Sequence, residues 1–96
     1  MRFEWDARKS RANKAKHGVS FELATLVFAD PHAVSLPDDC RTEERWLTIG
    51  LIRGILVLAV VHTAEGQGDE EIIRIISARK ATRREREEYE DQHKKT

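Results

Sequence analysis

The sequence predicts an α+β fold in which an antiparallel meander sheet carries two N-terminal helices packed on one face and is followed by a C-terminal helix. Helical patterns precede residue 29 and follow residue 81, and strand patterns fill the segment between them. Short polar loops join consecutive strand patterns, and such loops connect antiparallel neighbours. A chain of 96 residues supports one modest core, so residues 1–96 are expected to form a single domain.

A short edge strand and a basic helix are expected first. Phe3-Glu4-Trp5 alternates apolar and polar side chains, as a half-buried strand does. Asp6 is a good N-terminal cap for a helix that reaches about Lys16 and stops at Gly18, where glycine accepts the left-handed conformation. The apolar positions of this helix are mostly alanines, which predicts a surface position.

The second predicted helix is short and buried. Ser20 caps it, it runs from Phe21 to about Phe28, and Asp30-Pro31 ends it. A helix–turn–helix that binds DNA is disfavoured, because the second helix offers a groove only Glu22 and Thr25 among apolar side chains.

Three strands follow, at His32–Leu36, Arg45–Leu51 and Ile55–Thr63. The third is apolar on both faces, so it is expected in the centre of the sheet. The connections are a polar loop at Pro37–Glu43, a tight turn at Arg53-Gly54, and the glycine-rich segment at 64–69.

The stretch Glu71–Arg86 is expected to organise the fold. Four isoleucines in five positions predict a central strand, and Arg74 interrupts them. Thr82 and Glu85 form a capping-box pattern for a helix that ends near Gln92. In a regular strand Arg74 and Arg79 point to opposite faces, so they can share one ligand only if the strand twists or bulges near Ser77 and Ala78.

Charge is neutral in total but unevenly distributed. Residues 1–17 contain six basic and two acidic side chains, residues 79–86 contain five and one, and the segment between them contains four and ten. The two basic blocks either meet in a positive surface that attracts phosphate or form two solvated helix faces.

The compartment is expected to be the cytoplasm. A single cysteine, Cys40, excludes an internal disulfide, and the charged start does not resemble a signal peptide. The longest apolar run, Ile55–Val61, is far below the roughly 20 residues that span a bilayer, so no membrane role is expected.

Several chemical classes lack their signatures. The four histidines are scattered without zinc-ligand spacing, and neither a Gly-x-Ser-x-Gly elbow nor a glycine-rich phosphate loop is present. Acidic residues in and after the Pro37–Glu43 loop either hold magnesium or are ordinary solvated acids: Asp38, Asp39, Glu43 and Glu44. The second interpretation is favoured, and no metal and no cofactor are predicted.

An arginine-rich site without metal suits cleavage of RNA by its own 2′-hydroxyl. This reaction needs a general base, cations for the phosphorane, and an acid for the leaving oxygen. Arg45, Arg74 and Arg79 lie on or at the ends of predicted strands, and an arginine fork binds two phosphate oxygens. His17 or Glu44 is the predicted proton-transfer group.

Each of these residues also has a structural interpretation. Arg74 is otherwise an ion-pair residue, Arg45 a solvated charge at a strand end, and His17 a partner of the helix dipole. His62, at the end of a central strand, is expected to be a structural histidine. A binding module that holds RNA or protein without cleaving it is the alternative function.

The chain resembles the BrnT toxin family over nearly its whole length. Matching segments include the most specific one, Ile73–Thr82, and these further positions: Phe3-Glu4-Trp5-Asp6, Lys16 to Glu22, Val27-Phe28, Asp30-Pro31, Glu44-Arg45, Ile49-Gly50, Arg84-Glu85 and Tyr89. The tail after Tyr89 matches no family motif and is assigned no role.

The resemblance implies a RelE-like fold and a metal-independent ribonuclease that stops translation. It also implies inhibition by a BrnA antitoxin, a ribbon-helix-helix protein that represses the operon, so operator DNA would be contacted only through the antitoxin in a hetero-oligomer. The implied catalytic residues are His17, Glu44, Arg45, Arg74 and Arg79. Basic neighbours expected to bind RNA are Lys16, Lys80, Arg83 and Arg84.

Overall fold

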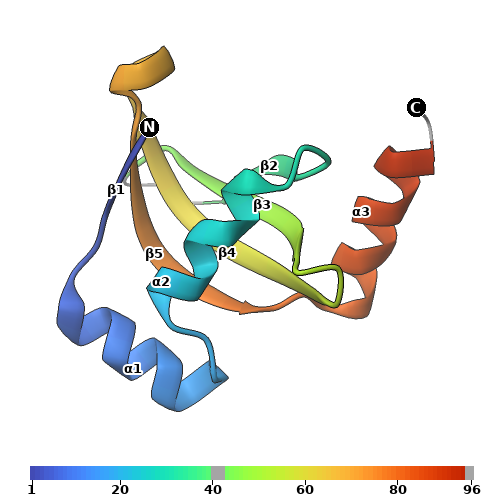
Figure 1. The fold of residues 1–96 in the computed structure, drawn as a ribbon, viewed down its shortest axis with the longest axis horizontal. Coiled ribbons are helices and arrows are strands. Elements are labelled where there is room, and N and C mark those ends of the chain that lie inside the picture. The colour runs from blue at the N-terminus through green and yellow to red at the C-terminus, as the bar shows by residue number, and fades with distance from the viewer. Residues whose placement is uncertain (40–42, 95–96) are drawn as a thin grey trace.

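The computed structural model describes residues 1–39 and 43–94, and its centre is a five-stranded sheet with the order β1-β5-β4-β3-β2 (Figure 1). Cys40 and the two residues after it in the predicted loop lie outside the described residues. The predicted antiparallel meander is confirmed by four consecutive strands: β2 (Val34–Asp38), β3 (Arg45–Ile52), β4 (Leu56–Glu65) and β5 (Ile72–Lys80).

The edge strand β1 (Arg2–Glu4) is parallel to β5, so the sheet is mixed and the prediction of a wholly antiparallel sheet is wrong there. No short loop joins β1 to β5, so the length of a connection does not fix the direction of β1. The strand predicted at His32–Leu36 is also shifted, because β2 runs through Pro37. A proline is tolerated in β2 since this strand lies at the other edge of the sheet.

The N-terminal caps are confirmed. The helix α1 (Ala7–His17) begins where the Asp6 carboxylate accepts the backbone N–H groups of Arg8 and Lys9, at 2.8 and 3.3 Å, and it ends at Gly18 with φ of 74°. The Ser20 hydroxyl accepts the N–H of Leu23 at 3.1 Å to cap α2 (Phe21–Ala24).

The predicted second helix is shorter than expected and continues as a 3₁₀ helix, η1 (Thr25–Ala29). At the point of change the Thr25 hydroxyl donates to the carbonyl of Glu22 at 2.7 Å, so a side chain takes part in the local backbone bonding. A second 3₁₀ turn, η2 (Gly68–Glu70), connects β4 to β5.

The sheet has a separate apolar cluster on each face. On the first face, here called the N-helix face, Phe21 and Val27 pack against Leu58, Ile73 and Ala78. On the opposite face, here called the α3 face, Tyr89 of the C-terminal helix α3 (Arg83–Lys94) packs with other residues: Ile49, Ala59, Val34, Leu36, Leu47 and Val57. Figure 1 shows α2 in front of the sheet and α3 at the end opposite α1. No helix in the described ranges is both long and apolar enough to cross a membrane.

A partly buried hydrogen bond joins α3 to the rest of the fold. Tyr89 Oη donates to Asp30 Oδ2 at 2.7 Å, and the same oxygen accepts the N–H of Leu51 at 2.8 Å. Burial and the adjacent Asp30 carboxylate raise the pKa of the Tyr89 phenol to about 12. These bonds lower the pKa of Asp30 even though burial of its carboxyl opposes the shift.

Replacing Tyr89 by Phe is therefore expected to lower the free energy of unfolding by about 1–2 kcal/mol, because a hydrogen bond to a charged group is lost. Urea denaturation measures the change, with the exposed neighbour Glu90→Gln as control. Tyr89 is the single tyrosine of the chain, so an absorbance titration of the wild type reports this phenol alone and should give a midpoint near pH 12. An ordinary midpoint near 10 together with unchanged stability would contradict the bond to Asp30.

Candidate functional site

A β-bulge in β5 puts Arg74 and Arg79 on the same face of the sheet. Val61 pairs with Ser77 but its neighbour His62 pairs with Ile75, so Ile76 is an extra residue. The side-chain alternation shifts there, because Ile73, Ile75 and Ala78 all belong to the core on the N-helix face. Arg74, Ser77 and Arg79 therefore belong to the α3 face, and the bulge lies near Ser77 and Ala78, as sharing of one ligand by the two arginines requires.

Arg45 lies on this face as well. Arg45 is the first residue of β3, and every second side chain of a strand points to the same face. Leu47 and Ile49, two and four residues later, pack in the cluster under α3, so Arg45 points to that face too. Strands β3 and β5, which lie on either side of β4, thus present three guanidinium groups to one side of the sheet. They define the arginine face, which consists of Arg45, Arg74 and Arg79 on the α3 face.

The carboxylate of Glu43 lies between two of these arginines. Its Oε1 accepts from Arg45 Nε at 2.9 Å, and its Oε2 accepts from Arg74 NH2 at 2.7 Å. The hydrogen bond from Arg45 and the positive charge of both arginines lower the pKa of the Glu43 carboxyl. The sequence pattern favours the neighbouring Glu44 for the site, but Glu44 is exposed, and it is the predicted loop acid Glu43 that contacts the arginines.

Arg79 makes a two-pronged pair with Glu85 of α3. Its NH1 and NH2 donate to the two carboxylate oxygens at 2.6 and 3.0 Å. Glu85 also accepts the N–H of Thr82, and Thr82 Oγ1 accepts the N–H of Glu85, which confirms the predicted capping box. The hydrogen bonding between the two side chains raises the pKa of Arg79 and lowers the pKa of Glu85. The pair joins the end of β5 to the first turn of α3.

His17 is the last residue of α1 and is half-buried. Helix α1, which carries His17, is held against β5, because the Asn13 side chain makes hydrogen bonds with the backbone of Ala78. In the described part of the chain no hydrogen bond or ion pair joins His17 to Arg74 or Arg79. The proton-transfer roles of His17 and Glu44 stay predictions.

The residues expected to bind RNA lie near the junction of β5 and α3, apart from Lys16 on α1. Lys80 ends β5 and is exposed, as are Arg83 and Arg84 in the first turn of α3. Arg83 makes a long contact of 3.3 Å with Glu87, and both side chains are largely solvated. These three residues at the β5–α3 junction are here called the basic rim; within it Lys80 pairs with Leu58 and so belongs to the N-helix face, opposite Arg79.

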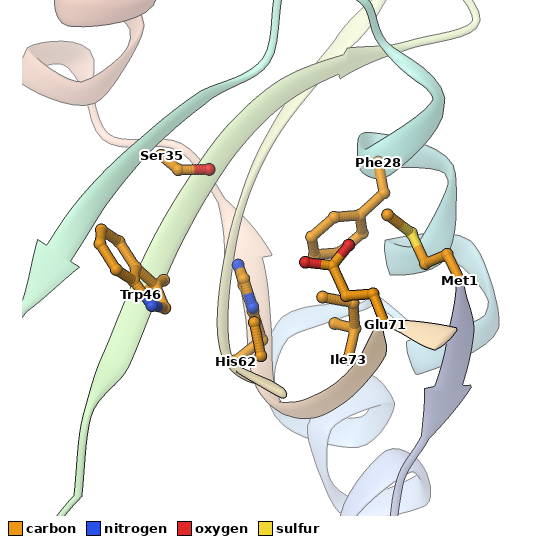
Figure 2. Close-up of a pocket in the computed structure, with 8 residues that line it drawn as sticks. Met1, Phe28, Ser35, Trp46, His62, Glu71 and Ile73 are labelled. Carbon is orange, nitrogen blue, oxygen red and sulfur yellow. The ribbon is translucent and has the colours of Figure 1, made fainter. Parts of the chain in front are cut away.

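A pocket of about 340 Å³ lies on the other side of the sheet (Figure 2). In Figure 2, His62 lies between Trp46 on one side and Phe28, Glu71 and Ile73 on the other. His62 is buried, and its Nε2 is 2.6 Å from the hydroxyl of Thr48. Burial lowers the pKa of His62, which agrees with the structural role predicted for it.

The acidic residues of the β2–β3 connection do not gather into a formed metal site. Within residues 1–39 and 43–94, no group of three or more His, Cys, Asp or Glu side chains has an arrangement that could hold a metal ion. Glu43 pairs with the arginines, and Asp38, which ends β2, contributes a favourable charge interaction to Arg79.

The arrangement is suited to binding an anion with several oxygens. Guanidinium groups keep their charge at any physiological pH, and their forks match phosphate geometry. Two of the three rest on β5, and the backbone at both positions pairs with β4, at Thr63 for Arg74 and at Ala59 for Arg79. The sheet thus presents a fixed cationic surface on one side and an apolar pocket on the other.

Comparison with known proteins agrees with this description. Residues 5–85 match the family model described as the ribonuclease toxin BrnT of type II toxin–antitoxin systems. The fold is similar to the crystal structure of the Brucella abortus ribonuclease toxin BrnT, with a TM-score of 0.58, 26% sequence identity, and coverage of 86% of this chain and 99% of that chain. A search of curated proteins found no match. Since the family model covers most of its length, the chain belongs to the BrnT family of ribonuclease toxins of type II toxin–antitoxin systems.

Proposed function

We propose that the chain is an endoribonuclease that cleaves RNA without a metal ion and binds the scissile phosphate with Arg45, Arg74 and Arg79. The observation that supports this most directly is the bulge at Ile76, which gathers the two β5 arginines on the face that also holds Arg45. A regular strand would have separated them.

In the proposed reaction the 2′-oxygen attacks the adjacent phosphorus and the bond to the 5′-oxygen breaks. The products are a 2′,3′-cyclic phosphate and a free 5′-hydroxyl. The arginines stabilise the additional negative charge that develops on the phosphorane oxygens. A base must remove the 2′ proton and an acid must protonate the leaving oxygen.

Glu43 is poorly suited to act as this base. Two arginines stabilise its ionised form and lower its pKa, so the carboxylate has little tendency to take a proton. His17 and Glu44 are the proposed proton-transfer residues. The basic rim of Lys80, Arg83 and Arg84, together with Lys16, would hold the RNA on either side of the cleaved bond.

The proposed partner is an antitoxin of the BrnA type, a ribbon-helix-helix protein. An acidic segment of it would bind the arginine face and block access of RNA, and operator DNA would be contacted through the antitoxin alone. The expected compartment is the cytoplasm, where both the RNA and the antitoxin occur.

A cleavage assay tests the reaction. Purified chain incubated with labelled RNA is expected to give discrete products with or without EDTA, and a 2′-deoxy substitution at the cleaved position should abolish cleavage there. Addition of the antitoxin should suppress all products. Loss of cleavage in EDTA would overturn the metal-free mechanism and make the acidic segment Asp38 to Glu44 the candidate site. Binding that weakens with salt, without any product, would favour a non-catalytic binding module.

A further inference from the structure

Glu43 occupies the position between Arg45 and Arg74 that a phosphate group would need. Each of its carboxylate oxygens accepts one hydrogen bond, from Arg45 at 2.9 Å and from Arg74 at 2.7 Å. Two non-bridging oxygens of a phosphodiester would accept from the same two donors. The N–H groups that face Glu43 cannot serve both anions fully at once.

We infer that Glu43 is an internal competitor for the RNA phosphate: its carboxylate holds Arg45 and Arg74 in place in the free protein and is displaced when RNA binds. This inference rests on the proposed function of the arginine face. It assigns to Glu43 an effect on affinity for RNA, which is distinct from proton transfer.

The exposure of the three side chains fits an exchangeable contact. Arg45 is 31% exposed, Arg74 is 47% exposed and Glu43 is 34% exposed, so water already reaches the contact. Solvated ion pairs of this kind contribute little to stability, because water screens the charges and two long side chains must be ordered. An incoming phosphate can therefore replace Glu43 at small cost.

The pair of Arg79 and Glu85 differs in this respect. Glu85 is 17% exposed, binds Arg79 with both oxygens and also caps α3 through Thr82. Displacing Glu85 would open the helix start. Among residues 1–39 and 43–94, the hydrogen bonds of the Glu43 side chain go to the guanidinium groups of Arg45 and Arg74 and not to the backbone of a helix or strand. Of these two acids, Glu43 is therefore the one that RNA would displace.

The test is equilibrium binding of an RNA that cannot be cleaved because its 2′-oxygens are methylated. Glu43→Gln is expected to bind this RNA about three- to tenfold more tightly than the wild type at constant salt. The control is Glu22→Gln, which removes the same charge from an exposed position on α2, and it should change affinity less than twofold. In an Arg74→Ala background the effect of Glu43→Gln should shrink.

Equal gains for Glu43→Gln and Glu22→Gln would overturn the inference, since the change would then reflect total charge. Weaker binding by Glu43→Gln would also overturn it, because Glu43 would then position the arginines without competing. Binding is measured separately from cleavage. A chain that binds more tightly after Glu43→Gln but never cleaves RNA supports the competitor role and refutes the proposed catalysis.

Discussion

Alanine in place of Arg74 or of Arg79 is expected to lower the rate of RNA cleavage about 10²- to 10³-fold, since one preorganised donor to the developing negative charge is lost. Cells that express either variant without antitoxin should grow, whereas the wild-type chain should stop growth. Rates on labelled RNA and growth curves measure the two effects. The expectation follows from the bulge at Ile76, which brings both side chains to one face.

Two control variants separate loss of the phosphate-binding guanidinium from loss of positive charge in general and from a weakened contact between β5 and α3. Arg8→Ala removes one positive charge from an exposed position of α1 and should leave cleavage near the wild-type rate. Glu85→Gln weakens the contact between Arg79 and α3 but keeps the guanidinium, so it should retain far more activity than Arg79→Ala. Full toxicity of both arginine variants would remove the arginine face from the mechanism.

The predicted helix caps were confirmed, whereas the length of the second helix and the bounds of the strand at His32–Leu36 were not. Capping residues lie at the predicted helix ends, because a cap needs only backbone groups within a few residues of it. They are Asp6, Gly18, Ser20 and the Thr82–Glu85 capping box. The antiparallel meander followed from short connections for the same reason. Its parallel neighbour β1 was not predictable in direction, since its partner is at the other end of the chain.

The arginine face was predictable in composition but not in geometry. Arg45, Arg74 and Arg79 were identified as charges on strands, yet the run Ile72–Ile76 contains no glycine or other mark of a bulge. The position of the bulge depends on how β5 pairs with β4 and packs under α2, which are contacts between distant segments. The sequence likewise does not show which of the adjacent acids Glu43 and Glu44 turns toward the arginines, because this depends on how the chain bends before β3.

Asn13→Ala is expected to lower the free energy of unfolding by about 3–5 kcal/mol, because several buried backbone groups lose their partners together. The Asn13 amide donates to the carbonyls of Val19 at 2.8 Å and Ala78 at 2.6 Å, and its Oδ1 accepts the N–H of Ala78 at 3.2 Å. The side chain thus satisfies the edge of β5 beyond its pairing with β1, which ends at Arg74. Such a loss is a large share of the roughly 5–15 kcal/mol that stabilises a typical domain.

Urea denaturation measures this loss, with Lys14→Ala, at the exposed next position of α1, as the matched control that should stay within about 0.5 kcal/mol of wild type. A change below 1 kcal/mol for Asn13→Ala would show that water replaces the amide at the strand edge. Ala78 immediately precedes Arg79, so the same substitution loosens the segment that carries a proposed phosphate-binding arginine. Cleavage by the fraction that remains folded should therefore also fall, and it should fall less than in Arg79→Ala, because the guanidinium is still present and only its support is weakened.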